Sequence, residues 1–218
     1  MNELTGRKDK PSPIIKGGSQ EARKKNWVDH FKDLLGKPSL VVGELPKIKF
    51  SPTLPISTEP FSLDEINLVI KSIANKKSPG LDNIPSIIWK DPNLTSLLLS
   101  ICNENMVTLS PPSSWLKAGI IPIPKKGDLS APKNYRGISL MPIAAKIFNK
   151  LILNRLVPYV DPLLRINQNG FRRGRSTLAQ ILALRRIVEE IRNSNREMAL
   201  VFVDFKKAFD SINRDVLF

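Results

Sequence analysis

The feature that most constrains the fold is a run of five apolar residues, 199–203, which stops at Asp204. The run shows no alternation and is preceded by polar residues 195–197, a pattern typical of a strand buried on both faces. Such a strand requires a sheet that other elements cover on both sides. A carboxylate at its end is held rigidly and can face a cleft, which suits a divalent metal ligand. The alternative is that Asp204 caps a helix beginning in the following KKAFDSI segment.

Positive charge is concentrated in the second half of the chain. The 218 residues include 34 Lys and Arg against 20 Asp and Glu, a net charge of +14. Residues 1–110 carry 15 basic and 12 acidic side chains, a net of +3, whereas residues 111–218 carry 19 and 8, a net of +11. Phosphate backbones are the commonest partners of such a surface. Nucleic acid is therefore the favoured partner, with an anionic membrane surface or a merely solvated basic face as alternatives.

One cysteine and one histidine exclude several classes of protein. Cys102 has no disulfide partner, and Cys102 with His30 cannot supply the roughly four ligands of a structural zinc site. We interpret Cys102 as a small core residue and His30 as structurally incidental. The N-terminus lacks a signal-peptide core, and no segment approaches the roughly 18 apolar residues of a membrane span. We expect an intracellular, non-secreted protein of the nucleus or cytoplasm, without membrane contact and of open oligomeric state.

Prolines and glycines divide the chain near residue 60. Residues 1–20 are polar and rich in turn residues, which indicates poor order. Apolar side chains at helical spacing then predict a helix over residues 21–35 that ends at Gly36. Residues 37–60 contain five prolines and are predicted to form an extended linker.

Four helices are predicted beyond this boundary. Ser62 and Glu65 form a capping box at the start of the first, and Phe61 with Ile66 occupies the positions of a hydrophobic staple. The other three are predicted over residues 94–107, 143–157 and 178–193, with Pro142 beginning the second of these and Pro158 closing it. The last is predicted to face the core with Ile181, Leu184, Val188 and Ile191.

Two segments between these helices carry basic residues suited to phosphate. Residues 118–124 and 135–140 predict a β-hairpin with a long, mobile tip, on which Lys125, Lys126, Lys133 and Arg136 are placed to grasp a phosphate chain. Arg172, Arg173 and Arg175 lie between two glycines and the Ser/Thr cap of the last helix, a combination that favours an anion such as a triphosphate. A solubilising loop is the alternative for the hairpin.

The order of five segments resembles one protein family. SPGLDNIP, IPIPKKGD, NYRGISL, NGFRRGRST and FVDFKKAFD, at this spacing, are similar to segments of the reverse transcriptases of non-LTR (LINE-type) retrotransposons. The resemblance covers residues 61–218. It implies an α+β fold, the fingers of a right-hand polymerase (61–195) with the start of the palm (196–218), cut off before the rest of the palm and the thumb. Residues 1–60 resemble the ill-defined region upstream of the polymerase.

The family's activity implies roles for individual residues. The reaction is RNA-directed DNA synthesis, in which two Mg²⁺ ions, or Mn²⁺, assist transfer of a deoxynucleotide onto a primer 3′-hydroxyl. RNA template, DNA primer and dNTP are the implied ligands. The resemblance makes Asp204 and the carbonyl of Phe205 metal ligands, Phe209 the steric gate, and Asp210 a residue that orients the turn. It assigns the triphosphate to Lys125 or Lys126 together with Arg136, and nucleotide or template to Arg172, with Arg173 and Arg175 secondary.

Two departures from the family pattern qualify this interpretation. One aspartate cannot hold two ions, and the family supplies further carboxylates from a Tyr-x-Asp-Asp hairpin, whereas this sequence has no Asp-Asp pair. We therefore expect a metal site only with the full palm, and an inactive fragment without it. Gly137 stands where many relatives have proline, which is expected to loosen the hairpin.

Three rival interpretations remain. The first is a non-enzymatic RNA- or DNA-binding remnant, which would bind nucleic acid without incorporating nucleotides. The second is a group II intron-type maturase, which shares fingers and palm and would bind intron RNA specifically. The third is a basic helical scaffold without a nucleic-acid partner, which salt-sensitive RNA binding would exclude.

Overall fold

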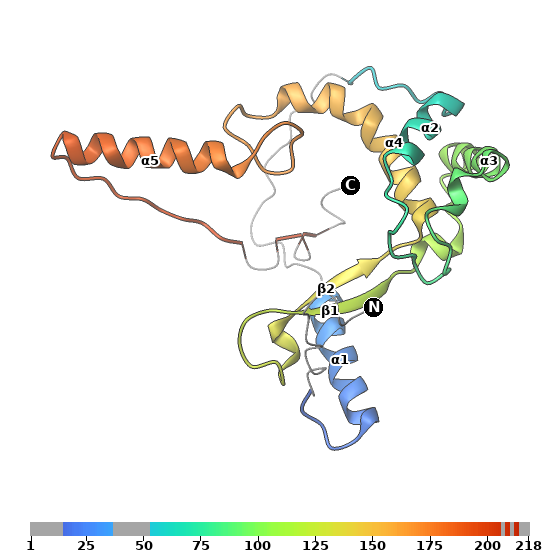
Figure 1. Ribbon diagram of the computed structural model, residues 1–218, viewed down its shortest axis with the longest axis horizontal. Coiled ribbons are helices and arrows are strands. Elements are labelled where there is room, and N and C mark those ends of the chain that lie inside the picture. The colour runs from blue at the N-terminus through green and yellow to red at the C-terminus, as the bar shows by residue number, and fades with distance from the viewer. Residues whose placement is uncertain (1–14, 37–52, 206–207, 210–211, 214–218) are drawn as a thin grey trace, which may run out of the picture. The chain divides into compact units, whose positions relative to one another are not determined.

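The computed structural model describes residues 15–36, 53–205, 208–209 and 212–213. These residues form five α-helices, short 3₁₀ turns and one two-stranded sheet (Figure 1), which confirms the α+β class. The chain divides into two compact units. We call the unit containing 15–36 and 117–141 the hairpin unit, and the unit containing 53–116 and 142–204 the helical unit. Within the described ranges, no helix combines the length and apolarity that crossing a membrane requires.

The hairpin unit consists of two antiparallel strands and one helix. Strands β1 (Gly119–Pro124) and β2 (Tyr135–Leu140) pair from Gly119 opposite Leu140 to Pro124 opposite Tyr135, which confirms the predicted hairpin. Helix α1 (Gln20–Leu35) packs beside it and ends at Gly36 as predicted, with the Gly36 N–H bonded to the Lys32 carbonyl. Helix α1 precedes the region of the family resemblance, yet it forms part of this unit.

Aromatic rings join α1 to the hairpin. The Trp27 ring meets the Tyr135 ring edge to face at 4.8 Å and stacks on Phe31 at 5.8 Å. Tyr135 is buried, and burial raises the pKa of its hydroxyl, which donates to the Leu129 carbonyl at 2.9 Å. Aromatic pairs of this kind add about 0.5–1.5 kcal/mol each beyond the area that they bury.

The helical unit has its core between α2 (Leu63–Lys71), α3 (Pro92–Thr108) and α4 (Ile143–Val160), which lie together in Figure 1. The predicted capping box is present, since Ser62 Oγ accepts from the Glu65 N–H and the Glu65 carboxylate accepts from the Ser62 N–H. The buried apolar side chains come from all three helices, from the residue before the α2 cap and from the 3₁₀ turn before α3: Phe61, Ile66, Val69, Ile70, Trp89, Leu98, Cys102, Ile143, Ala144, Ile147 and Leu151.

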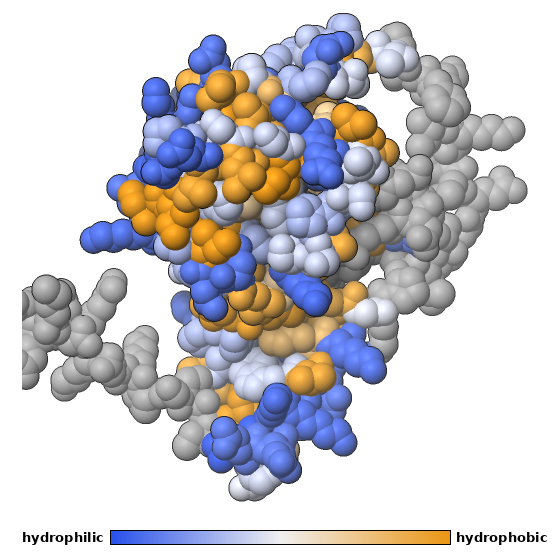
Figure 2. All heavy atoms as spheres, turned by 90° about the vertical axis from the view of Figure 1, so that its right-hand side faces the viewer, coloured by the Kyte–Doolittle hydropathy of each residue, from blue (hydrophilic) through white to orange (hydrophobic). Residues whose placement is uncertain are grey.

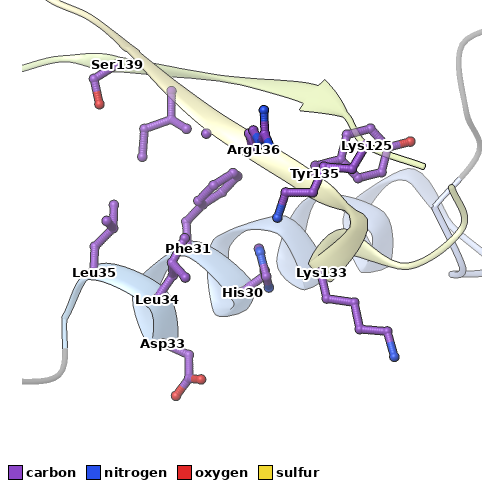
Figure 3. Close-up of a pocket in the computed structure, with 12 residues that line it drawn as sticks. His30, Phe31, Asp33, Leu34, Leu35, Lys125, Lys133, Tyr135, Arg136 and Ser139 are labelled. Atoms are coloured by element: carbon purple, nitrogen blue, oxygen red, sulfur yellow. The ribbon is translucent and has the colours of Figure 1, made fainter. Parts of the chain in front are cut away.

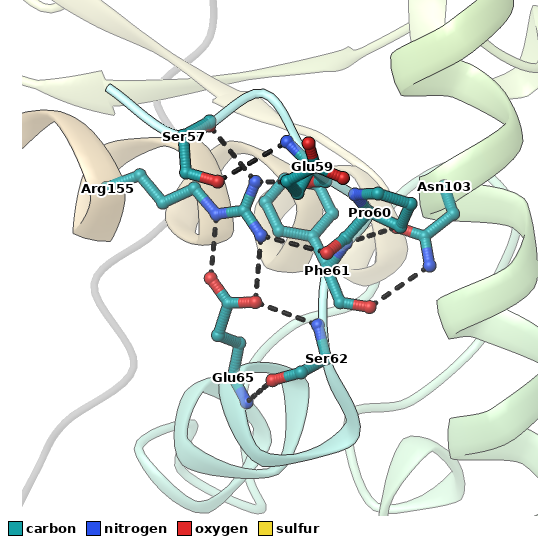
Figure 4. Close-up of polar contacts among 8 residues, drawn as sticks. All are labelled: Ser57, Glu59, Pro60, Phe61, Ser62, Glu65, Asn103 and Arg155. Atoms are coloured by element: carbon teal, nitrogen blue, oxygen red, sulfur yellow. Dashed lines mark hydrogen bonds and ion pairs between the residues drawn. The ribbon is translucent and has the colours of Figure 1, made fainter. Parts of the chain in front are cut away.

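Arg155 of α4 binds both α2 and the segment that precedes α2 (Figure 4). Its guanidinium binds the Glu65 carboxylate through Nε at 2.7 Å and Nη2 at 2.9 Å. It also donates to the carbonyls of Ser57, Glu59 and Pro60 and lies 4.2 Å from the centroid of the Phe61 ring. One side chain therefore fixes both the capping residue of α2 and the approach to it.

Two predictions about helices are wrong. Pro158 does not close α4, which continues to Val160, because a proline in the last turn removes only one hydrogen bond there. Helix α5 (Thr177–Asn193) forms as predicted, but none of its residues is buried, and Ile181 and Val188 are exposed. Its apolar face therefore lies outside the core of the described residues.

The prediction of a buried strand over residues 199–203 is also wrong. The segment is not part of a strand, and Val201, Phe202 and Val203 are 84%, 79% and 75% exposed. A strand needs a neighbour for its backbone N–H and C=O groups, and the two strands in the described residues pair only with each other. Most of KKAFDSI, including Asp210, lies outside the described residues.

Apolar side chains also appear on the surface of the helical unit. Leu63 and Leu68 on α2 and Leu97 on α3 are each more than half exposed. Figure 2 shows apolar groups gathered on the side of the molecule where α3 lies in Figure 1. Contiguous apolar surface of this kind is typical of contacts with other protein.

Candidate functional site

The hairpin unit contains a cavity of about 700 Å³ between α1 and the two strands (Figure 3). Its cationic walls come from Lys125, Lys133 and Arg136, with Asp33 as the one acidic side chain among the lining residues. The remaining lining residues are His30, Phe31, Leu34, Leu35, Ile120, Tyr135, Gly137 and Ser139. A cavity with three cations and one carboxylate favours an anionic ligand, because the positive charges attract it and their N–H groups can bind its oxygens.

The connection between the strands is held by hydrogen bonds rather than left as an open loop. The Lys125 N–H bonds to the Asn134 carbonyl at 2.7 Å, and the Asn134 side-chain amide donates to the Asp128 carbonyl at 2.7 Å. Asp128 accepts from the Ser130 N–H at 2.9 Å. These contacts fix the backbone positions from which Lys125 and Lys133 extend, so the site requires little ordering before it binds an anion.

Gly137 sets the distance between α1 and β2. A β-carbon at this position would lie 2.6 Å from Cε1 of Phe31 and 3.0 Å from Cγ2 of Ile120. Real β-carbons essentially never come within 3.0 Å of another heavy atom, so any larger residue would push the helix away. The glycine therefore permits the close packing that forms one wall of the cavity.

The structure brings together some of the predicted residues of the hairpin. Lys125 and Arg136 line the same cavity, whereas Lys126 does not line it, and the assignment of these residues to a triphosphate stays a prediction. His30, interpreted from the sequence as incidental, also lines the cavity and contacts the Phe31 ring at 5.2 Å. Nothing in the sequence near His30 signals this position, because it depends on α1 packing against a hairpin about ninety residues later.

Arg172 lies in the helical unit, in the loop between α4 and α5, and its guanidinium is used within that loop. Nε and Nη2 bind the Asp161 carboxylate at 2.8 and 3.0 Å. The other N–H groups donate to the carbonyls of Asp161, Arg165 and Gln168. The Arg172 side chain is only 7% exposed, and its hydrogen bonds lower the pKa of the Asp161 carboxyl. Arg172 thus shapes the loop, while Arg173 and Arg175 are exposed.

The candidate metal ligands lie in the exposed segment that follows α5. Asp204 is exposed, and Phe205 and Phe209 are 76% and 70% exposed. The Asp204 carboxylate and the Phe205 carbonyl are oxygen donors of the kind that Mg²⁺ prefers. However, the described residues contain no group of three His, Cys, Asp or Glu side chains that could hold a metal. Asp204 and Phe205 therefore do not form a metal site by themselves.

Comparisons with known proteins identify relatives of the chain. Residues 123–218 match the family described as reverse transcriptase (RNA-dependent DNA polymerase). The chain is 33% identical over 170 residues, 76% of its length, to a probable RNA-directed DNA polymerase from transposon BS of Drosophila melanogaster, of which it covers 18%. It is 32% identical over 177 residues, 78% of its length, to the RNA-directed DNA polymerase from the mobile element jockey of the same species, of which it covers 19%.

A relative with lower identity is also a protein of a retrotransposable element. The chain is 26% identical over 155 residues, 71% of its length, to a retrovirus-related Pol polyprotein from the type-1 retrotransposable element R2 of Popillia japonica, of which it covers 21%. The chain thus spans about a fifth of the length of each of these three relatives. The matched region and the names of these relatives agree with the family that the five sequence segments resemble.

Proposed function

We propose, from the premise that this chain is a relative of the reverse transcriptases of non-LTR retrotransposons, that it forms the fingers and the first palm segment of an RNA-directed DNA polymerase. Its ligands in that role are an RNA template, a DNA primer and an incoming dNTP. The observation that carries the proposal is that Lys125, Lys133 and Arg136 line one cavity of the hairpin unit.

The chemistry of the proposed reaction explains these cations. A dNTP carries several negative charges at neutral pH, and more charge develops on its phosphates as pyrophosphate leaves. Arg136 can bind two phosphate oxygens through one planar guanidinium, whereas Lys125 and Lys133 act as point charges. Together they hold the triphosphate and neutralise charge that grows in the transition state. Lys126, which is exposed beside Lys125, adds positive charge at the approach to the cavity.

The remaining predicted residues have supporting roles in this proposal. Asp204 and the Phe205 carbonyl are ligands for divalent metal when further carboxylates complete the site, and Mg²⁺ there would activate the primer hydroxyl. Phe209 excludes a ribose 2′-hydroxyl, and Asp210 orients its turn. Arg172 acts by holding its loop in place. Arg173 and Arg175 offer exposed cations to nucleic acid.

Calorimetric titration of the purified chain with dTTP in Mg²⁺ tests the proposal. We expect dTTP to bind, thymidine monophosphate to bind much more weakly, and Arg136→Gln to weaken dTTP binding about tenfold or more, since a charge-assisted bidentate contact is lost. Lys150→Gln is the matched control, because this exposed lysine on α4 lies in the other unit and its loss changes the net charge equally. Equal binding of dTTP and monophosphate, or equal effects of the two variants, would refute the proposal.

A further inference from the structure

The loop between α4 and α5 displays one aromatic side chain in an unusual way. Phe171 is 96% exposed, and its backbone has a left-handed φ of +60°. A left-handed conformation costs a non-glycine residue about 1–2 kcal/mol. The conformation is especially rare at a bulky residue. Gly170 precedes Phe171 directly, and an added β-carbon at Gly170 would meet nothing within 4 Å. The sequence thus places a phenylalanine where a glycine would be easier to accommodate.

The loop beneath Phe171 is closely hydrogen-bonded, so this conformation does not result from a loose chain. Arg172, the next residue, turns inward and donates to the Asp161 carboxylate and to three backbone carbonyls. Arg175 donates to the Ile166 carbonyl at 3.3 Å, and the Gln180 amide donates to the Asn167 carbonyl. The hydrogen bonds hold the backbone on both sides of Phe171. Strain that persists because the surrounding structure fixes it points to function.

The charge around Phe171 is positive. Residues 165–175 contain four arginines and no acidic residue. Arg172 is neutralised by Asp161, but Arg173 and Arg175 are exposed close to Phe171 in the sequence. An exposed aromatic ring flanked by arginines is the combination that binds single-stranded nucleic acid, because bases stack on the ring while the cations bind phosphates.

We infer that Phe171 is a stacking platform for an unpaired base of single-stranded RNA or DNA, with Arg173 and Arg175 binding the adjacent phosphates. The inference rests on the proposed function, from which it takes nucleic acid as the ligand, and it adds a base contact that is separate from the triphosphate cavity of the hairpin unit. The inward turn of Arg172 contributes by fixing the backbone that presents the ring.

The test is fluorescence anisotropy of the purified chain with a labelled single-stranded RNA oligonucleotide and with an abasic oligonucleotide of equal length. Phe171→Gly is the decisive variant, because glycine adopts the left-handed backbone without strain, so the variant is expected to fold at least as stably. Because Phe171→Gly loses one stacked base, we expect it to bind the RNA about 5- to 150-fold more weakly than wild type does. Phe171→Trp should retain the wild-type affinity. The abasic probe should bind wild type and Phe171→Gly equally.

Leu109→Gly is the matched control. Leu109 is also a large apolar residue with a left-handed φ, +52°, and is 83% exposed, but it follows α3 and has no arginine near it in the sequence. This variant should bind RNA as wild type does. Equal RNA binding by Phe171→Gly and wild type, or equal loss in both glycine variants, would overturn the inference while leaving the proposed function intact. Absence of any RNA binding by the wild-type chain at low salt would overturn both.

A second measurement tests the two arginines. Replacing Arg173 and Arg175 with Gln should weaken binding to the normal and the abasic probe alike, and should reduce the slope of log K against log salt by about 1.4, since each phosphate contact to a single strand contributes about 0.7. Phe171→Gly should leave that slope unchanged, because stacking releases no counterions. A change of slope in Phe171→Gly would contradict the division of roles between ring and cations.

Discussion

Replacing Arg155 with Ala should destabilise the helical unit substantially. The guanidinium makes two bonds to the Glu65 carboxylate and three to backbone carbonyls, and its side chain is 13% exposed. Removal leaves the Glu65 carboxylate with only the Ser62 N–H as donor, leaves the carbonyls without the guanidinium, and loses the contact with the Phe61 ring. Breaking a buried pair costs about 3–5 kcal/mol, but the Glu65 side chain is 34% exposed and water can reach it. We therefore expect a loss of about 2–3 kcal/mol in the free energy of unfolding.

Urea denaturation followed by circular dichroism at 222 nm measures this loss. The matched control is Arg185→Ala on α5, because Arg185 also bonds a carboxylate, that of Glu189, through Nε at 2.9 Å, but its side chain is 74% exposed. An exposed pair spaced i to i+4 contributes about 0.3–0.5 kcal/mol, so the control should lose no more than that. Equal, small losses in the two variants would refute the reasoning that burial makes the Arg155 contacts valuable.

Four further predictions follow from individual contacts. The hydrogen bond from Arg155 lowers the pKa of Glu65 below its usual 4.5, so stability from this pair is present above pH 4.5 and is lost as pH falls below it. Urea midpoints measured between pH 7 and pH 3 should fall more steeply for wild type than for Arg155→Ala, and parallel curves would contradict this. Gly137→Val should separate α1 from β2 and weaken dTTP binding, which calorimetry measures; unchanged affinity would mean that the close approach is not needed. Burial raises the pKa of the Cys102 thiol to about 12, so iodoacetamide should label it slowly at pH 8 in the native chain and rapidly in urea; fast native labelling would show that the core opens. Residues 199–203 are an exposed apolar segment, so Phe202→Lys should reduce self-association, which analytical ultracentrifugation measures. A wild-type chain that is monomeric and melts cooperatively would show that this segment does not cause self-association.

Much of the secondary structure could be predicted from the sequence because its signals are local. The capping box of Ser62 and Glu65 predicts the start of α2, the turn residues between two extended segments predict the hairpin, and Gly36 marks the end of α1. In each case the residues that form the feature lie within a few positions of one another. The basic residues of the hairpin were also assigned to the triphosphate from a local pattern, and that assignment stays a prediction, although Lys125 and Arg136 line the same cavity.

The errors and omissions concern contacts between distant residues. Arg155 binds Glu65 across ninety positions, and the position of His30 depends on the packing of α1 against the hairpin. The apolar residues 199–203 predicted a buried strand, yet a strand forms only beside a partner, and an apolar run does not reveal whether one is present. The role of Arg172 in binding nucleotide or template stays a prediction, whereas its ion pair with Asp161 could not be foreseen, because Asp161 carries no local signal.

The triphosphate site proposed for the hairpin unit can be tested most directly by mapping where a nucleoside triphosphate contacts this chain. A dTTP derivative with a photoreactive azidoanilide on its γ-phosphate would be crosslinked to the purified chain, and the modified peptides identified by mass spectrometry. We predict crosslinks within the two segments of the hairpin unit that line the cavity, residues 30–35 and 117–141, suppressed by excess dTTP and reduced in Arg136→Gln. Crosslinks confined to other segments, or unaffected by excess dTTP, would contradict this prediction.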